Sequence, residues 1–393
     1  MVSQDPIGDV VDNPSKRILI VAGEASADLH GSNLIHSIKE INPNVEFYGI
    51  GGEKIRAMGV DILYDASSMA VVGITEVFSK LKTIMKALRD LKKSLDSYCP
   101  DLVILIDYPD FNLHLAKFAR KKGIPVLYYI SPQIWAWRGG RIKKIARLVD
   151  KMLLILPFER SFYEKEKIDV EFVGHPLVDI VNPKFSKDEA LKRFNLEKDR
   201  LTIGLLPGSR KSEVKRLLPI MLNAMKLLNQ RLKTPQLVLP VASTMSETEI
   251  RKIIDKTYKD ANVNIIEGHT YDLINISNVV IVASGTATLE AAIMNSPMVI
   301  LYKVSSLTYF IGKFLVKVKD IGLVNLVAGR RIVSELIQND VTPERIANEV
   351  MSILENEEVY YKMKNELSWV KRELGTPGAS FRVAKIATDM LSS

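Results

Sequence analysis

A turn of small residues, Ser284-Gly285-Thr286, follows an apolar, β-branched run and leads into a helix-forming segment that carries Thr288 and Glu290. The apolar run is typical of a buried parallel strand. Free backbone N–H groups at the start of the next helix can bind a phosphate. Glu290 lies about one and a half turns into that helix, where its carboxylate can accept hydrogen bonds from two ribose hydroxyls. The stretch predicts a nucleotide-diphosphate site, although an ordinary helix start with an exposed Glu shows the same pattern.

A second turn, Gly208-Ser209-Arg210, follows another apolar run in the same half of the chain. Gly208 permits a close approach of the backbone, and Ser209 can cap the next helix. The guanidinium of Arg210 can neutralise a diphosphate. Alone, the turn is equally well explained as a strand-to-helix connection with a surface Arg. Together with the first turn, it favours a diphosphate site.

Carboxylates follow two apolar runs of the first half: Glu24 after one, and Asp107 and Asp110 after the other. Strand ends of this kind face a ligand in parallel α/β folds. Asp110 is the candidate general base that removes a proton from an attacking hydroxyl. Capping of the adjacent helix by Asp110 is the alternative. Both interpretations stay open at this point.

Other candidates stand near the ends of later runs. Trp135 and Arg138 lie where apolar sequence gives way to a basic cluster, and a tryptophan at such a boundary can cover a sugar face. Packing in the core explains this aromatic residue equally well. His175 stands at the expected junction between the two halves. It either reaches a cleft there or is a hinge residue without chemistry.

The segment from Met69 onward is apolar and continues into helical spacing, with lysines interleaved. An apolar patch ringed by lysines suits an anionic membrane surface. The candidate membrane residues are Val71, Val72, Phe78 and Leu81. An ordinary amphipathic helix that packs on its own sheet is the alternative.

The composition limits the classes of protein. The chain has 393 residues, is 47% hydrophobic and carries a formal net charge of +8. Its length suggests two domains, and its charge suits an anionic partner. No nucleic-acid-binding motif accompanies that charge, so we expect no nucleic acid partner.

The single Cys99 excludes an internal disulfide and suits the cytosol. No Cys/His cluster has metal-ligand spacing, no apolar run is long enough to span a bilayer, and the first residues lack a signal-peptide core.

The elements that must position these residues alternate between apolar runs and helix-period segments, which predicts an α/β fold with parallel sheets. We expect two Rossmann-like, doubly wound domains facing a cleft, with ligands at the carboxyl ends of the strands. The expected division is a flexible tail (1–16), a first Rossmann-like domain (17–177), a second Rossmann-like domain (178–372) and a C-terminal helix that packs back on the first domain (373–393). The expected strands are 18–22, 45–50, 102–106, 126–130, 152–156, 170–173, 202–206, 237–240, 263–266, 279–283 and 299–303, followed by helices at 342–355, 357–373 and 379–391.

Together, these motifs resemble the lipid-A-disaccharide synthases, glycosyltransferases that join two acylated glucosamines. The similarity runs in order from residue 17 to the C-terminus, and one departure is Ala27, where that family usually has Gly. The matching motifs are Gly23-Glu24-Ala25-Ser26 with Asp28, Asp107 with Pro109-Asp110-Phe111-Asn112, Ser131-Pro132 with Trp135-Ala136-Trp137-Arg138, Leu156-Pro157-Phe158-Glu159, Gly174-His175-Pro176, Leu206-Pro207-Gly208-Ser209-Arg210 and Ser284–Glu290.

The resemblance implies a glycosyltransferase B fold, with the acceptor and membrane domain at 17–177 and the UDP-sugar donor domain at 178–372. It also implies an inverting transfer of 2,3-diacylglucosamine from UDP-2,3-diacylglucosamine to 2,3-diacylglucosamine 1-phosphate. The products would be a β(1→6) disaccharide 1-phosphate and UDP. No cofactor is expected. Because the chain has no Asp-x-Asp triplet, helix N–H groups and Arg210 would stabilise the leaving UDP. The implied residues are Asp110, Arg210 and Glu24 for catalysis, and Asp107, Asn112, Trp135, Arg138, His175 and Asn325 for the acceptor site or cleft.

The same resemblance implies a cytoplasmic protein, peripheral on the cytoplasmic face of the inner membrane of a Gram-negative bacterium. It is also compatible with a homodimer. Two other interpretations remain open. Another UDP-sugar transferase or epimerase of the same fold would not need the apolar segment 69–78. A non-catalytic membrane-surface adaptor would not need Asp110, Arg210 and Glu290 together.

Overall fold

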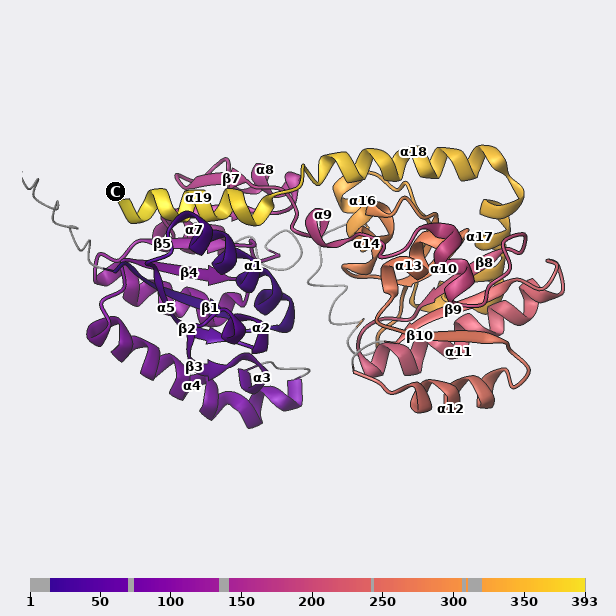
Figure 1. The fold of residues 1–393 in the computed structure, drawn as a ribbon, viewed down its shortest axis with the longest axis horizontal. Helices are drawn as coiled ribbons and strands as arrows, with labels where there is room; N and C mark the ends of the chain where they lie inside the picture. Colours follow the sequence, from indigo (N-terminus) through magenta and orange to yellow (C-terminus); the bar gives the residue numbers. More distant parts are fainter. Residues whose placement is uncertain are drawn as a thin grey trace, which may run out of the picture.

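The computed structural model describes residues 15–69, 74–133, 141–241, 244–305, 309 and 320–392, with the backbone alone over 74–80. Two lobes lie side by side, each with a parallel sheet flanked by helices (Figure 1). This arrangement confirms the predicted α/β fold of two doubly wound parallel sheets.

The first sheet has the strand order β3-β2-β1-β4-β5-β6-β7, and all its pairs are parallel. Its central strands are continuous apolar runs because helices cover both faces. Every residue of β4, for example, is buried. The strands are β1 (Arg17–Ala22), β2 (Glu46–Gly51), β3 (Asp61–Asp65), β4 (Leu102–Ile106), β5 (Val126–Tyr129), β6 (Lys151–Leu154) and β7 (Asp169–Phe172).

The second sheet has the order β10-β9-β8-β11-β12-β13 and is also parallel. Here too the central strands β8 and β11 are buried throughout. The strands are β8 (Thr202–Leu206), β9 (Gln236–Val241), β10 (Val263–Glu267), β11 (Val279–Ala283), β12 (Met298–Tyr302) and β13 (Glu335–Ile337).

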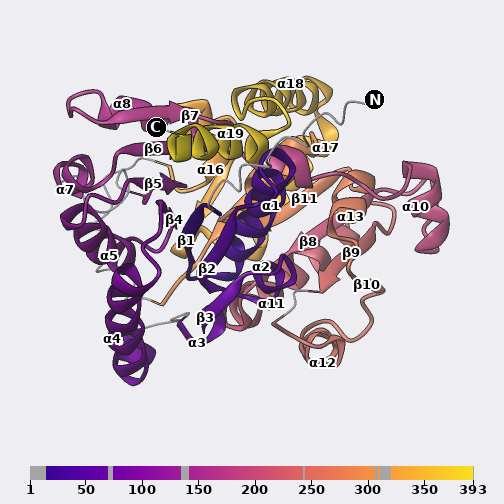
Figure 2. The ribbon, with the colours of Figure 1, turned by 60° about the vertical axis from the view of Figure 1, so that its left-hand side comes forward.

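Helices connect the strands and cover the sheets, as the turned view shows (Figure 2). In the first lobe they are α1 (Ala25–Ile41), α2 (Glu53–Ala57), α3 (Ala66–Met69), α4 (Ile74–Ser97), α5 (Pro109–Lys121), α7 (Arg141–Leu148) and α8 (Arg160–Tyr163). The others are α9 (Leu177–Ile180), α10 (Lys187–Arg193), α11 (Lys211–Asn229), α12 (Glu247–Thr257), α13 (Thr270–Ile276), α14 (Ala287–Ile293), α16 (Leu323–Ala328), α17 (Pro343–Glu355), α18 (Glu357–Glu373) and α19 (Ala379–Ser392).

The strand order reverses at one place in each sheet. β1 lies between β2 and β4, and β8 lies between β9 and β11. In open parallel sheets, ligands bind outside the carboxyl ends of the strands at this reversal. The loops after β1 and β4, and those after β8 and β11, are therefore the expected ligand-binding positions.

Two crossings connect the lobes, one after β7 and one after α18, and they are bonded to each other. The N–H of His175 donates to the carbonyl of Leu374 at 2.8 Å. The carboxylate of Asp179 accepts from the N–H groups of Gly378 (2.6 Å) and Ala379 (3.2 Å) at the start of α19. α19 then packs against α1 of the first lobe, whereas α18 lies over the second (Figure 1).

Every strand expected from the sequence is present, with bounds within two residues of the expected ones. Two further strands, β3 and β13, were not expected, and both lie at sheet edges. Edge strands are short and carry charged residues, and both of these contain acidic residues. They therefore lack the continuous apolar run that marks the inner strands.

Candidate active site

A pocket of about 370 Å³ lies at the reversal of the second sheet, between the loops after β8 and β11. The two turns singled out from the sequence form its walls. The lining residues are Leu206, Pro207, Gly208, Ser209, Arg210, Glu213, Pro240, Val241, Thr270, Ala283, Ser284, Gly285, Thr286, Ala287 and Glu290. The structure thus brings the predicted diphosphate-binding residues together around one cavity.

The turn before α14 leaves room for a ligand. Gly285 has φ +153°, and a Cβ there would meet nothing within 4 Å. Thr286 is the N-cap of α14, whose first N–H groups have no acceptor within a helix. Thr288 is buried, and its hydroxyl donates to the carbonyl of Gly285 at 2.8 Å. Thr288 therefore fixes the turn. The N–H groups of Ser284 and Thr288 donate to the carbonyls of Leu301 and Gly285, whereas those of Gly285, Thr286 and Ala287 have no acceptor among the described residues and can bind an anion.

Glu290 lies deeper in the same wall. Burial raises its pKa, and a hydrogen bond with Tyr271 opposes that rise. Its side chain lines this pocket and also the neighbouring one. A mostly buried carboxylate at this position can accept from hydroxyl groups that enter from either pocket.

The opposite wall begins with Gly208, whose φ of +111° is a conformation that favours glycine. Arg210 is the N-cap of α11, and among the described residues its exposed guanidinium pairs with Glu213 alone, at 3.2 Å. It is therefore available to a ligand, because exposed pairs are weak. The expected helix cap by Ser209 is wrong. Ser209 precedes the N-cap, and its carbonyl accepts from the Thr244 hydroxyl at 2.5 Å.

The reversal of the first sheet brings two carboxylates close to each other. Glu24 is the N-cap of α1 after β1, and Asp107 follows β4. Burial raises the pKa of Asp107 to about 6, and the charge of Glu24 adds to the rise. An acid with this pKa is mostly ionised at neutral pH and still accepts a proton readily, as a general base must.

The backbone at Asp107 is unusual. Asp107 and Tyr108 have φ of 45° and 48°, a left-handed conformation that costs energy in residues other than glycine. The Asp107 carbonyl accepts from Asn112 Nδ2 at 2.5 Å and from the Tyr128 hydroxyl at 2.6 Å. Gly23 leaves space for the Tyr108 ring, since a Cβ there would lie 2.7 Å from it. The surroundings thus fix a strained turn, and strain of this kind gathers at functional sites.

Asp110 has a different environment. It lies in the first turn of α5, after the N-cap Tyr108, and its side chain is 77% exposed. Its carboxylate forms an ion pair with Arg141 at the start of α7. Asp110 therefore does not cap α5 and is not buried beside Glu24. Asp110 lies in the first turn of the helix that follows Asp107, and Arg141 reaches it from α7.

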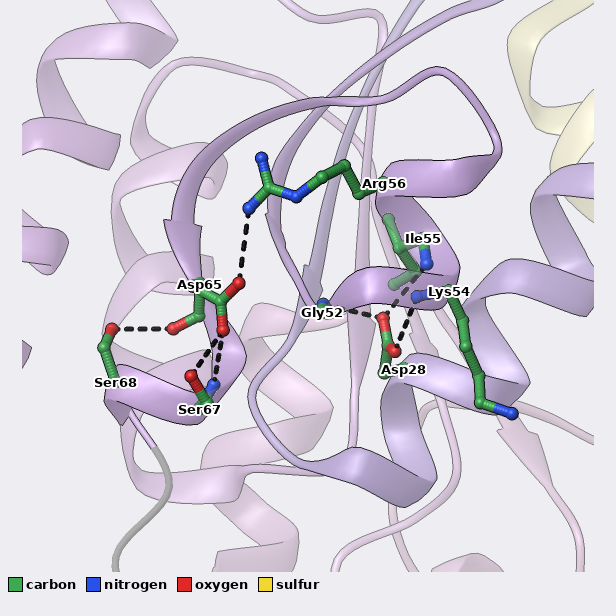
Figure 3. Close-up of polar contacts among 8 residues, drawn as sticks. All are labelled: Asp28, Gly52, Lys54, Ile55, Arg56, Asp65, Ser67 and Ser68. Carbon is green, nitrogen blue, oxygen red and sulfur yellow. Dashed lines mark hydrogen bonds and ion pairs between the residues drawn. The ribbon is translucent and has the colours of Figure 1, made fainter.

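Sequence reasoning missed the structural role of Asp28, which it named as part of a motif shared with the resembled family. Asp28 lies in the first turn of α1, and its carboxylate caps the neighbouring helix α2 (Figure 3). It accepts from the N–H groups of Gly52 (2.6 Å), Lys54 (3.1 Å) and Ile55 (3.1 Å). A contact between residues this far apart has no signal in the local sequence. Asp28 fixes the loop after β2 against the start of α1.

Two residues expected in the acceptor site or cleft are buried and hydrogen-bonded within the protein. His175 is buried at the lobe junction beside His30, and burial lowers its pKa to about 3. Its Nδ1 accepts from the N–H of Leu177 at 3.1 Å. Asn325 in α16 is also buried. It donates to the Val333 carbonyl and to Glu335, and accepts from the N–H groups of Ile332 and Val333.

Trp135 and Arg138 lie outside the described residues, as do Val71 and Val72, and no side chain is described for Phe78. On the described part of α4, Leu81 and Met85 are 46% and 54% exposed. Farther along the helix, Leu91 and Leu95 are buried in the core. The helix therefore packs on its own lobe through its second half and exposes apolar side chains in its first half.

No described helix is long and apolar enough to cross a membrane. The described residues also contain no group of three or more His, Cys, Asp or Glu side chains placed to hold a metal ion.

Comparison with solved structures supports the fold. A UDP-GlcNAc 2-epimerase from Neisseria meningitidis bound to UDP-GlcNAc superposes with a TM-score of 0.65 at 16% identity, covering 95% of this chain and 100% of that chain. The calicheamicin glycosyltransferase CalG4 gives a TM-score of 0.61 at 12% identity, covering 96% and 99%. At these identities the likeness shows the shared two-lobe architecture alone.

Sequence comparison is more specific. The family model for lipid-A-disaccharide synthetase matches residues 18–381. A lipid-A-disaccharide synthase of Syntrophus aciditrophicus is 50% identical, over 96% of this chain and 98% of that protein. One from Geobacter sulfurreducens is 47% identical, over 97% and 99%. The chain therefore belongs to the lipid-A-disaccharide synthetase family and is a glycosyltransferase of lipid A disaccharide synthesis.

Proposed function

We propose that the protein transfers 2,3-diacylglucosamine from UDP-2,3-diacylglucosamine to 2,3-diacylglucosamine 1-phosphate, with inversion at the anomeric carbon. The products are UDP and a β(1→6)-linked disaccharide 1-phosphate. Membership of the family supports the reaction. The pocket between the loops after β8 and β11 is the observation that carries the donor assignment, because its two walls suit the two parts of a nucleoside diphosphate.

The diphosphate lies against the small residues Ser284, Gly285 and Thr286 and the N-terminus of α14 in this proposal. The exposed guanidinium of Arg210 reaches the diphosphate from the opposite wall. Glu290 accepts from the ribose hydroxyls. Charge grows on the UDP as the glycosidic bond breaks, so preorganised N–H groups and a cation there stabilise the transition state more than the ground state.

The first lobe supplies the base, and the structure favours Asp107 for this role. Asp107 is mostly buried, has a pKa of about 6 and stands beside Glu24 at the reversal of the sheet. Asp110, the base expected from the sequence, is exposed and ion-paired with Arg141. The ion pair occupies the Asp110 carboxylate, so a substrate hydroxyl would have to compete with Arg141 for it. Asp110 remains the base predicted from the sequence, and comparing the turnover of Asp107→Asn with that of Asp110→Asn tests the two candidates.

Inversion needs a single displacement. The acceptor hydroxyl attacks the anomeric carbon from the face opposite to UDP, and its proton goes to the base as the new C–O bond forms. One basic carboxylate is sufficient, since no covalent intermediate has to be formed and hydrolysed. Inverting sugar hydrolases likewise use a single base, beside the acid that protonates their leaving group. Glu24 raises the proton affinity of Asp107 in this scheme and does not itself contact the hydroxyl.

The acylated substrates place the reaction at a membrane surface, and we propose that α4 docks there, on the cytoplasmic face of the inner membrane. Leu81 and Met85 provide exposed apolar surface, and Lys82 and Lys86 are exposed beside them. Each lysine near an anionic leaflet contributes about 1 kcal/mol. The family resemblance is also compatible with a homodimer, which equilibrium sedimentation would test.

The function is tested by incubating the protein with radiolabelled UDP-2,3-diacylglucosamine and the acceptor, followed by separation of the lipid products. We expect a labelled disaccharide 1-phosphate and equimolar UDP. Formation of an epimerised UDP-sugar without disaccharide would instead favour the epimerase alternative. Binding to vesicles without any turnover would favour the adaptor.

A further inference from the structure

A second pocket, of about 290 Å³, adjoins the donor pocket. The two cavities share Thr270 and Glu290 in their walls. The second pocket is lined by Asn182, Lys184, Gly268, His269, Thr270, Tyr271, Asp272 and Glu290. Since Glu290 takes the ribose in the proposed function, whatever is attached to the ribose on the side away from the diphosphate extends into this second pocket.

The pocket contains a histidine oriented by a carboxylate. Nδ1 of His269 lies 2.9 Å from Asp272 Oδ2. The other oxygen of Asp272 accepts from the N–H groups of Lys184 (2.7 Å) and Phe185 (2.9 Å), so the carboxylate acts only as an acceptor. In the neutral form of the ring the proton is therefore on Nδ1, and Nε2 has a free lone pair.

The ring of His269 is fixed in place by aromatic neighbours. Phe185 stacks on it with a centroid distance of 5.4 Å and an interplanar angle of 30°, and Phe194 lies at 5.4 Å and 59°. The side chain is still 21% exposed, and no described residue bonds its Nε2. Gly268 beside it has φ +74°, and a Cβ there would meet nothing within 4 Å. A flat ligand can therefore approach both the backbone and Nε2.

We propose that His269, held by Asp272, is a specificity-determining residue that recognises the pyrimidine ring of the donor nucleotide. This inference rests on the proposed function, because it needs a UDP donor with its ribose at Glu290. Uracil carries an N–H at position 3, which donates to an acceptor such as Nε2. Cytosine has a lone pair at that position and would face the lone pair of Nε2. The pocket should therefore prefer UDP to CDP.

Calorimetric titration of UDP and CDP tests this proposal. We expect the unaltered protein to bind UDP at least about tenfold more tightly than CDP, a difference typical of one hydrogen bond made or opposed. His269→Phe keeps an aromatic ring but removes Nε2, and should bring the two affinities to within about twofold. His269→Gln carries an amide that can accept from uracil or donate to cytosine, so it should bind both nucleotides without restoring the preference. His36→Phe, on the exposed face of α1, is the matched control and should change nothing.

Unchanged UDP preference in His269→Phe would overturn the inference and leave the donor site intact. The donor assignment has its own readout, because Arg210→Ala should weaken the binding of both nucleotides equally. The donor assignment fails if UDP affinity is unaffected in that variant.

If His269→Phe does not fold, ¹⁵N-histidine spectra of the unaltered protein test the proposal, since the chain has only five histidines. We expect UDP to shift the Nε2 resonance of His269 and pyrophosphate to leave it in place. A shift with both ligands, or with neither, would contradict the proposal.

Discussion

At the scale of single residues, the environment of Asp107 links function to stability. Its pKa is about 6 in the folded protein against an ordinary value of 3.8, because of burial and then of the charge on Glu24. The folded state therefore binds this proton more tightly than the unfolded state does. It follows that Asp107 opposes folding more and more as the pH rises through this interval, and that the cost is complete above about pH 7.

We therefore expect Asp107→Asn to stabilise the protein at pH 8, by up to ~3 kcal/mol. The amide keeps an acceptor for the Tyr108 N–H and loses the charge. At pH 3.5, where the carboxyl is mostly protonated in both states, the gain should largely vanish. Urea unfolding of both proteins at the two pH values measures this. An equal change at both pH values would show that charge burial is not its cause.

The donor residues give a second prediction at this scale. Arg210→Ala and Glu290→Ala should each weaken UDP binding by ~1.5–3 kcal/mol, the range for hydrogen bonds to a charged group. Arg210→Ala should also lower turnover, since charge on the leaving UDP grows in the transition state. Calorimetry gives the affinities, and unchanged affinity in both variants would refute the donor site.

A third prediction concerns metal. Since the chain has no Asp-x-Asp triplet and the proposal assigns the leaving-group charge to N–H groups and Arg210, turnover should persist in excess EDTA. The measurement compares initial rates with and without chelator. A strict requirement for Mg²⁺ or Mn²⁺ that is restored by adding the ion would contradict this account.

The positions of the donor residues could be predicted from the sequence, whereas the difference between the two candidate bases could not. The meeting of Gly208, Arg210 and Ser284 was predictable because each follows a strongly apolar run, and the ends of neighbouring strands must meet. The place of Glu290 beside them followed from its position about one and a half turns into the next helix. The difference between Asp107 and Asp110 was not predictable. It depends on a left-handed backbone and on an ion pair with Arg141 from another helix, and neither has a local sequence signal.

At the scale of elements, α4 combines two roles along its length. Its second half packs in the core through Leu91 and Leu95, and its first half exposes Leu81 and Met85. We expect Leu81→Ser with Met85→Ser to release the protein from anionic vesicles while UDP affinity stays unchanged. Each exposed apolar side chain that enters lipid contributes ~25 cal/mol per Å² removed from water.

Vesicle flotation and thermal melting measure the two effects separately. Ile41→Ser is the matched control, because Ile41 is also a partly exposed apolar residue but stands at the end of α1. Salt alone should release only part of the protein, since it screens the lysines and leaves the apolar term. Lower melting temperature without a selective loss of flotation would indicate that these side chains serve packing instead.

The inner strands were predictable because they are continuous apolar runs buried on both faces. The edge strand β13 was not, since its position depends on Glu335. That buried carboxylate accepts from the N–H groups of Ile321 and Gly322 and from Asn325. A polar network of this kind fixes a strand from outside its own sequence. The same network explains why Asn325 is buried in the structure.

At the scale of the whole molecule, the two sheets have separate tasks. The second presents an anion-binding pocket at its reversal, and the first presents a strained, acidic strand end at its own. The lobes are joined by two crossings that are bonded to each other near His175 and Leu374. The domain limits expected from the sequence, at residues 177 and 372, stay a prediction that limited proteolysis would test.

The central claim is that a base on the first lobe serves a nucleotide-sugar bound on the second. Its most direct test is the turnover number of Asp107→Asn beside that of Asp110→Asn, with UDP affinity measured in both. We predict that Asp107→Asn loses ~10²–10⁴-fold in kcat, the range for a general base, and keeps its UDP affinity. Asp110→Asn should lose less than about tenfold. Near-normal turnover in Asp107→Asn would contradict the account, and a large loss confined to Asp110→Asn would assign the base to Asp110.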